Sequence, residues 1–302
     1  MIKYSLYLSM CLMAYSAYAQ SPADALRYSW VTPGATARIL AVGGANGSLG
    51  GDISSTFINP AGLGLFKTGD FVLTPGYIFS KAKSNYLSTT TEDKTDGKGI
   101  LGTTGIVFGT GSAQKKIRGG AVSLAFNRSG DFNSNILYRG INNKSSYSQQ
   151  FLEEIRNNGD RDANNVAGGY PFGTSPAFNT YWIDTVAGGS SNNYNFQSRA
   201  PIGTGLIQQN SLKSKGGINE FALGLALNLR DKILVGGSIG VPILNYTREG
   251  EYTEADATSN PNNKFDYAQL TDNLNTSGVG INIKAGVIFK PAESWRLGFA
   301  VH

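Results

Sequence analysis

The sequence predicts an all-β protein, more specifically a transmembrane antiparallel β-barrel whose lumen is closed by an N-terminal hatch. Three observations predict this class. One stretch, residues 218–246, alternates between a large apolar face and a small-residue face. The connections between candidate strands alternate between short and long. The first part of the chain is rich in Gly and Ala and has no strand periodicity.

Residues 218–246 give the clearest signal. Successive side chains of a strand point to opposite faces, and from Phe221 to Leu229 the odd positions are all Phe or Leu. The positions between them hold Glu, Ala, Gly and Asn, and the alternation resumes at Ile233 after a very short turn at Arg230-Asp231-Lys232. A soluble sandwich would carry many charges on its second face. A face of small residues instead suits the inside of a barrel whose outside is lipid.

The composition agrees with this class. The 302 residues include 39 Gly, where about 21 are expected at ~7% usage, together with 15 Tyr and 15 Phe. Beyond the N-terminus no run approaches the ~20 apolar residues of a membrane helix. That observation leaves barrel strands open, because their alternation averages away. The formal charge of +5 is scattered along the chain, so nucleic-acid binding is not expected.

Residues 1–19 are typical of a secretory signal peptide, with cleavage predicted before Gln20. Cys11 lies inside the apolar run and follows Met10, which argues against a lipoprotein signal. The mature chain then contains no cysteine and can form neither a disulfide nor a thiolate metal site. The three parts of the signal are Lys3, the apolar run from Leu6 to Ala14, and Ala17-Tyr18-Ala19.

Residues 20–68 are predicted to form the hatch, a compact plug held by tight turns in which Gly supplies positive φ and Pro60 fixes a bend. The Gly pairs do not form a phosphate-binding loop, because no Lys-Ser/Thr and no strand–loop–helix frame accompanies them. The candidate hatch residues are Arg38, Asp52, Asn59, Pro60 and Ala61, of which Arg38 and the Asn59-Pro60-Ala61 turn are expected to hold the plug against the wall.

Residues 69–302 are predicted to form barrel strands. The expected strands are 70–80, 99–110, 119–127, 218–229, 232–246, 277–290 and 294–302. Most approach the ~9–11 residues that cross a bilayer at a tilt. The connections 79–98, 128–217 and 247–276 are long, whereas 111–118, 230–231 and 291–293 are short. Outer-membrane barrels alternate long external loops with short periplasmic turns in this way.

Several segments resemble the outer-membrane transporter family for long-chain fatty acids and hydrocarbons (FadL-like), in particular the Bacteroidetes branch whose members are sometimes labelled hemin receptors. The likeness spans the mature chain, and the Asn59–Leu63 element is its most specific part. The segments are Asp24-Ala25-Leu26-Arg27-Tyr28-Ser29, Ala37-Arg38, Gly43-Gly44-Ala45, Gly50-Gly51-Asp52, Asn59-Pro60-Ala61-Gly62-Leu63, Lys290-Pro291 and Trp295-Arg296-Leu297-Gly298.

The resemblance implies a fourteen-stranded barrel with an N-terminal hatch. Only seven strands are expected in this chain, whereas bacterial barrels have an even number and an open sheet in lipid leaves backbone groups without partners. His302 also differs from the aromatic ending usual for such chains. The expectation is therefore that the chain covers the hatch and about half of the wall, with the C-terminal half missing.

The connection 128–217 is long enough to carry function. Two helices are predicted in it, one capped by Ser146 and ended by Gly159, the other begun by Ser175-Pro176 and ended by Gly188. Their apolar faces either pack on each other or form a groove that captures an apolar ligand, and the family places such helices in an external loop. The candidate ligand-binding residues are Phe151, Leu152, Ile155, Phe178, Trp182, Ile183 and Val186.

Three interior charges are candidate lumen residues: Glu220, Lys284 and Arg296. They either meet a carboxylate head group or pair with each other and with the plug. No metal site is expected. Asp160, Asp162 and Asn164 begin a calcium-loop spacing that fails at its sixth and twelfth positions, so they are predicted to form a polar surface loop.

The favoured function is passive uptake of hydrophobic molecules such as long-chain fatty acids or hydrocarbons across the outer membrane, by a monomeric barrel that needs no cofactor. The alternative is an interaction barrel of the same architecture that serves protein secretion or envelope assembly. An enzyme is not expected, because His302 is the only histidine. A hemin-binding role, the third possibility, would have almost no axial ligand except Tyr.

Overall fold

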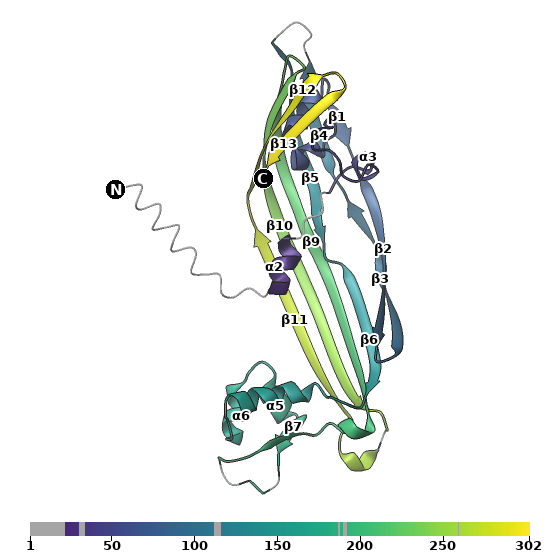
Figure 1. Ribbon diagram of the computed structural model, residues 1–302, viewed down its shortest axis with the longest axis vertical. Coiled ribbons are helices and arrows are strands. Elements are labelled where there is room, and N and C mark those ends of the chain that lie inside the picture. Colours follow the sequence, from purple (N-terminus) through teal and green to yellow (C-terminus); the bar gives the residue numbers. More distant parts are fainter. Residues whose placement is uncertain (1–21, 30–33, 112–115, 187, 190–191, 259) are drawn as a thin grey trace, which may run out of the picture.

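The computed structural model describes residues 22–29, 34–111, 116–186, 188–189, 192–258 and 260–302. The predicted signal peptide lies outside the described residues. The molecule is long and narrow, with a twisted sheet along its length (Figure 1). An N-terminal segment, residues 34–66, lies against one end of this sheet, and a small helical domain stands at the other.

The sheet is built around one long hairpin of β9 (Leu206–Leu229) and β10 (Ile233–Asp256), which pair along their whole length. Each strand has 24 residues, roughly 80 Å at ~3.3 Å per residue. Arg230 and Asp231 have φ of 54° and 59°, as a two-residue hairpin turn requires. The turn predicted at this point is confirmed.

Among the described residues, nine strands form this antiparallel sheet, in the order β1-β4-β5-β9-β10-β12-β13. Two more strands continue the flanks: β6 pairs with β9 beyond β5, and β11 pairs with β10 beyond β12. The antiparallel all-β class is thus confirmed. The sheet is open over the described residues, with β1 and β13 at its edges. The bounds are β1 (Asp70–Val72), β4 (Thr104–Gly111), β5 (Ile117–Asp131), β6 (Ser134–Asn142), β11 (Tyr267–Val279), β12 (Asn282–Ala292) and β13 (Trp295–Val301).

Two of the three predicted long connections, 79–98 and 247–276, are largely strand, which corrects the expected loop layout there. Residues 79–98 belong to a second sheet, the hairpin of β2 (Pro75–Tyr86) and β3 (Thr89–Leu101). Most of 247–276 belongs to β10 and β11, whereas 128–217 joins the main sheet only near its two ends, through β5, β6 and β9. The prediction followed apolar alternation, but cross-strand pairing of Thr, Tyr and Asn side chains also sustains a sheet whose two faces are both polar.

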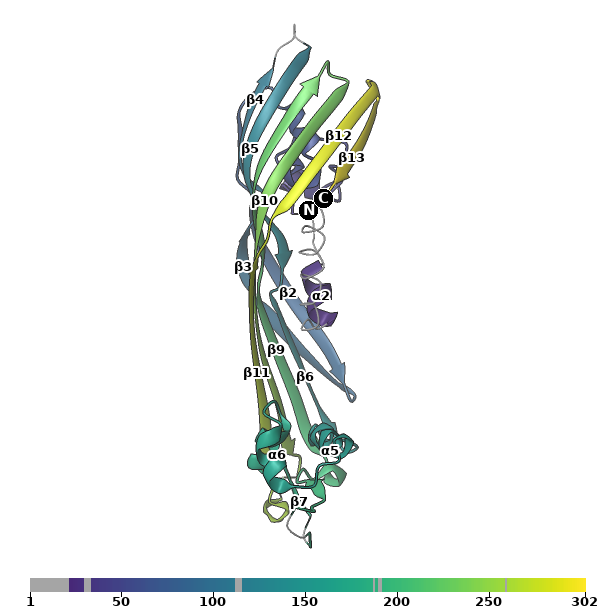
Figure 2. The same ribbon diagram turned by 90° about the vertical axis from the view of Figure 1, so that its left-hand side faces the viewer.

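The N-terminal segment folds on one face of the sheet. It contains α3 (Ala37–Leu40), α4 (Ser55–Ile58) and the 3₁₀ turn η2 (Pro60–Leu65). Ile53, Phe57 and Leu63 are buried against alanines of β5 and β9. Before it, α2 (Pro22–Ser29) lies on the same side of the sheet (Figure 2). The Tyr28 ring of α2 lies 6.1 Å from that of Tyr246.

The distal domain lies at the far end of β9 and β10. It comprises α5 (Ser148–Asn157), α6 (Ala163–Gly169), α7 (Thr174–Asn179), β7 (Ile183–Thr185), β8 (Phe196–Ser198), η3 (Ile202–Thr204) and the nearby η4 (Pro261–Asn263). The helix predicted at α5 is present, but its N-cap is Tyr147, which makes no side-chain capping bond, and not Ser146 as predicted. The Ser146 hydroxyl precedes the cap and accepts from the amide of Ser148 at 3.1 Å, and Gly159 follows the helix with φ 65°. None of the helices in the described chain is long and apolar enough to cross a membrane.

The second predicted helix is much shorter than expected. It ends at Asn179, Tyr181 turns the chain with φ 62°, and Ile183–Thr185 then pairs as a strand with Phe196–Ser198. Trp182, Ile183 and Val186 therefore do not lie on a helix face. Their spacing fitted a helix, but pairing between β7 and β8 determines the local conformation instead.

Candidate functional site

The two faces of the central sheet differ sharply in chemistry. Along β9 the apolar face, defined by Phe221, Leu223, Leu225 and Leu227, is uncovered, and Phe221 and Leu225 are 53% and 54% exposed. β10, β12 and β13 continue this face with further exposed side chains, among them Ile239, Val241, Ile283, Val287, Phe289, Phe299 and Val301. So large a contiguous apolar surface marks contact with another apolar phase or partner.

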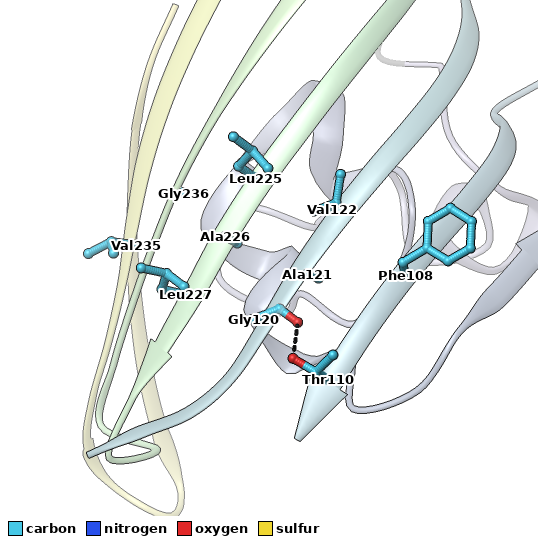
Figure 3. Close-up of a pocket in the computed structure, with 10 residues that line it drawn as sticks. All are labelled: Phe108, Thr110, Gly120, Ala121, Val122, Leu225, Ala226, Leu227, Val235 and Gly236. Carbon is cyan, nitrogen blue, oxygen red and sulfur yellow. Dashed lines mark hydrogen bonds between the residues drawn. The ribbon is translucent and has the colours of Figure 1, made fainter. Parts of the chain in front are cut away.

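A depression of about 690 Å³ interrupts the apolar face between β4, β5, β9 and β10. It lies where Gly120 contributes no side chain, so the space is framed by the exposed Phe108, Val122 and Leu227 (Figure 3). Two polar groups in its wall bond to each other, since the Thr110 hydroxyl donates to the Gly120 carbonyl at 3.3 Å. Such a depression can accept an apolar chain but offers no directional chemistry.

The opposite, small-residue face is defined by Ala222, Gly224 and Ala226 of β9 and their neighbours Gly236 and Gly286. It lies directly against the N-terminal segment. A Cβ at Gly236 would lie 2.5 Å from the carbonyl carbon of Pro60, and one at Gly286 would lie 1.9 Å from the Asn59 side-chain oxygen. Both distances are far inside van der Waals contact. The small residues therefore make room for the N-terminal segment.

The five candidate hatch residues mostly make their hydrogen bonds within the N-terminal segment. Asp52 accepts from the Thr36 hydroxyl at 2.8 Å and from the amide of Ser54 at 2.9 Å. Asn59 caps η2 by accepting from the Ala61 amide at 3.2 Å and donates to the Gly47 carbonyl at 2.6 Å.

Three of the five residues, Asn59, Pro60 and Ala61, also contact the sheet, whereas Arg38 does not. Asn59 donates to the Phe299 carbonyl of β13 at 3.4 Å. The Pro60–Ala61 backbone packs against Gly236, as described above. Arg38 is exposed and makes one long contact, 3.5 Å to the Gly51 carbonyl, so it does not join the segment to the sheet.

A cavity of about 730 Å³ lies beside the N-terminal segment on the small-residue side, at the break between β11 and β12. Its polar wall is a connected group. Lys284 lies 3.5 Å from the Glu220 carboxylate and donates to the Phe57 carbonyl at 3.1 Å, while Asn282 donates to Glu220 at 3.1 Å. The two interior charges are thus paired, which is one of the two alternatives that the sequence left open.

The rest of this cavity is largely apolar. Ile218, Leu244 and Val279 contribute to its wall, and Tyr28 of α2 borders it. Arg296 lies elsewhere and donates to the Leu49 carbonyl of the N-terminal segment at 2.7 Å. The cavity therefore combines an apolar wall with one paired ammonium and carboxylate, which suits a mainly apolar guest.

The seven residues predicted to capture a ligand lie together in the distal domain. Phe151, Ile155, Trp182 and Ile183 are buried in one cluster with Val166, Ala177, Ala200, Leu206 and Phe265. Leu152 and Phe178 pack against this cluster, and Val186 is exposed. Their main contact is with each other, so they form the core of the domain and not an open groove.

Glu254 of β10 joins the distal domain to the sheet and was not predicted from the sequence. It is fully buried and accepts from Ser146, the Tyr147 amide, Trp182, Gln208 and Tyr252 at 2.5–3.3 Å. Burial raises the pKa of the Tyr252 hydroxyl, and the charge of Glu254 and the hydrogen bond to it raise that pKa further. An acidic residue in a polar strand gives no sequence signal for such a role.

No protein-family model, curated protein or solved structure matches this chain in the comparisons made with known proteins.

Proposed function

We propose that this chain forms part of the wall and the plug of an outer-membrane β-barrel for passive uptake of hydrophobic molecules, such as long-chain fatty acids or hydrocarbons. One observation carries the proposal: the apolar face of the sheet is exposed, whereas the N-terminal segment covers the small-residue face. Lipid would cover the first face, and the N-terminal segment fills the second as a plug. The resemblance of this segment to the transporter family adds support.

Aromatic residues at the two limits of the apolar face support the same proposal. Phe126 and Phe221 lie 5.1 Å apart where the face ends toward the distal domain, and Trp295 is exposed near its other end. Membrane barrels carry aromatic girdles at both interfaces. In this proposal the cavity beside the plug receives the ligand, and burial contributes ~0.8 kcal/mol per CH₂.

The test is uptake of a radiolabelled long-chain fatty acid by proteoliposomes that contain the purified full-length protein. Thr276 lines the cavity, whereas Asn275, its neighbour on β11, is exposed and does not line it. Thr276→Trp fills the cavity and should slow uptake severalfold, while Asn275→Trp should match the wild type. Equal uptake by both variants, or by empty liposomes, would contradict the proposal.

A second candidate is an interaction barrel in protein secretion or envelope assembly. It is favoured by the strands that run far beyond the apolar face and present a folded domain at their ends. Phe172 at that end is 99% exposed, and Tyr181 is exposed too. Secreted cargo that co-purifies with the protein, together with a lumen free of lipid, would favour this candidate. Retained fatty acid in mass spectra of the purified protein would favour transport.

A further inference from the structure

A smaller pocket lies on the face of the sheet that the N-terminal segment covers, beyond α2 toward the distal domain. It has a volume of about 380 Å³ and is formed by α2, the end of β5, the start of β6, and β9 and β10. Register explains its composition: Ser134, Ser214 and Arg248 are consecutive partners across β6, β9 and β10 and thus form one row. Its volume lies at the small end of ligand pockets.

A buried side-chain donor in the wall of this pocket has no hydrogen-bond partner among the described residues. In the part of the chain that the structure describes, three buried side-chain atoms have no hydrogen-bond partner: Tyr28 Oη, Arg128 Nε and Arg248 Nε. Of the three, only Arg248 lines the pocket. Arg128 Nε lies 3.4 Å from the lining carboxylate of Asp131 and is ion-paired with it, and Tyr28 lines the larger cavity beside the N-terminal segment. Buried donors are nearly always satisfied, so the Arg248 Nε–H group can donate to an acceptor placed in the pocket.

The charges at the pocket cancel. Arg27 pairs with Asp24, Arg128 with Asp131, and Arg248 with Asp272. An anion would therefore compete with three carboxylates. A ligand that both donates and accepts can bind beside guanidinium and carboxylate groups without separating them, and hydroxyl groups do both.

The remaining wall is aromatic and aliphatic. Tyr246 is buried beneath the Arg27 guanidinium, whose central carbon lies 4.3 Å from the ring centre, and Phe132 packs edge-on at 5.6 Å. Ile136 and Leu212, which pair across β6 and β9, add an apolar side. Apolar faces beside donors and acceptors suit a ring with apolar faces and a hydroxylated edge.

We infer that this pocket binds a neutral sugar unit, a pyranose ring held by the Arg–Asp pairs and the serine hydroxyls against the aromatic wall. The inference does not depend on the proposed uptake of hydrophobic molecules. A failure of sugar binding leaves fatty-acid uptake untouched, and the reverse also holds.

The experiment uses the full chain, purified in an amine-oxide detergent because sugar-based detergents would compete for the pocket. Saturation-transfer NMR is recorded with maltose, lactose and N-acetylglucosamine, and with decanoate and sulfate as anionic probes. At least one sugar should show saturable transfer, and neither anion should displace it.

Three variants test whether the sugar binds in this pocket. Ser214→Leu fills the pocket, whereas Ser211→Leu makes the same change three residues away on the opposite face of β9. The first should weaken sugar binding about tenfold or more and the second should leave it unchanged. Arg248→Gln should weaken it similarly, with far-ultraviolet circular dichroism confirming the fold.

Absence of saturable sugar binding would overturn the inference, as would equal binding by both serine variants. Saturable binding of decanoate or sulfate that Arg248→Gln abolishes, with no sugar bound, would overturn it in favour of an anion site.

Discussion

Gly236 shows at the scale of one residue why the small-residue face is needed. Its absent Cβ would lie 2.5 Å from the Pro60 backbone, which cannot move without displacing η2. The next residue, Gly237, faces the other way, and a Cβ there would meet its nearest heavy atom, the Lys284 carbonyl, at 3.5 Å, an ordinary contact. Position 236 therefore requires Gly, whereas position 237 has room for a Cβ.

Gly236→Ala should destabilise the packing of residues 34–66 by about 1–3 kcal/mol through overpacking, whereas Gly237→Ala should change it by less than about 0.5 kcal/mol. The measurement is the urea midpoint for proteolytic release of this segment from purified protein. Equal midpoints for the two variants would show that the segment does not press on the sheet at Gly236.

Glu254 carries the second prediction at this scale. All five of its partners are donors, so the amide nitrogen that Glu254→Gln introduces must face donors in place of an acceptor. The variant should lose about 2–4 kcal/mol of distal-domain stability, while Glu251→Gln, an exposed change on the same strand, should lose almost none. Unfolding monitored by tryptophan fluorescence, to which Trp182 contributes, measures both. A Glu254→Gln protein as stable as Glu251→Gln would refute the anchoring role.

At the scale of elements, the sequence pattern predicted the strands whose apolar residues alternate and missed the strands that are polar on both faces. The β9–β10 turn and the strands around Leu225 and Val235 followed from alternation. The far half of both strands did not, because Gln208–Ser214 and Arg248–Ala255 are mainly polar on both faces. Glu254 was out of reach because its partners Gln208 and Ser146 are 46 and 108 residues away in the chain.

The distal helices show the same limit. The sequence located α5 to within a residue or two, because Ser146 and Gly159 flank the helix and act through local backbone geometry. Trp182 and Ile183 fitted the spacing of a helix, yet both are buried from an extended segment. Of the two alternatives left open for the predicted ligand residues, the structure shows packing on each other: all but the exposed Val186 belong to or pack against the core of the domain.

The end of β10 yields a pH prediction. The pKa of Tyr252 is raised, so above pH ~10 the unfolded chain releases this proton while the folded chain keeps it. Stability present below that pH is then lost as pH rises, by up to about 1.4 kcal/mol per pH unit. Tyr252→Phe should be less stable at neutral pH but lose stability less steeply in alkali. Denaturation curves between pH ~8 and ~11 measure the slopes, and parallel slopes would contradict the assignment.

At the scale of the whole molecule, β9 and β10 traverse two environments. Around Leu225 one face of the sheet is apolar and exposed, and the N-terminal segment covers the other face. Around Ser211 the sheet is polar on both sides and leads to a folded domain. Strands of ~9–11 residues suffice to cross a bilayer, so 24 residues leave more than half of each strand outside it under the proposed function. This division makes the effect of a new charge depend on its position along the strand.

Leu225→Arg and Ser211→Arg place the same side chain on the same face of β9, fourteen residues apart. If lipid covers the apolar face, the first should destabilise the inserted protein by about 2–4 kcal/mol, as expected for Arg near the midplane, and the second by less than about 1 kcal/mol. Urea unfolding from phosphatidylcholine vesicles measures both. Equal small losses, with Leu225→Arg protein that folds as a monomer without detergent, would show that no bilayer covers these leucines, and the proposed function would fall with that result.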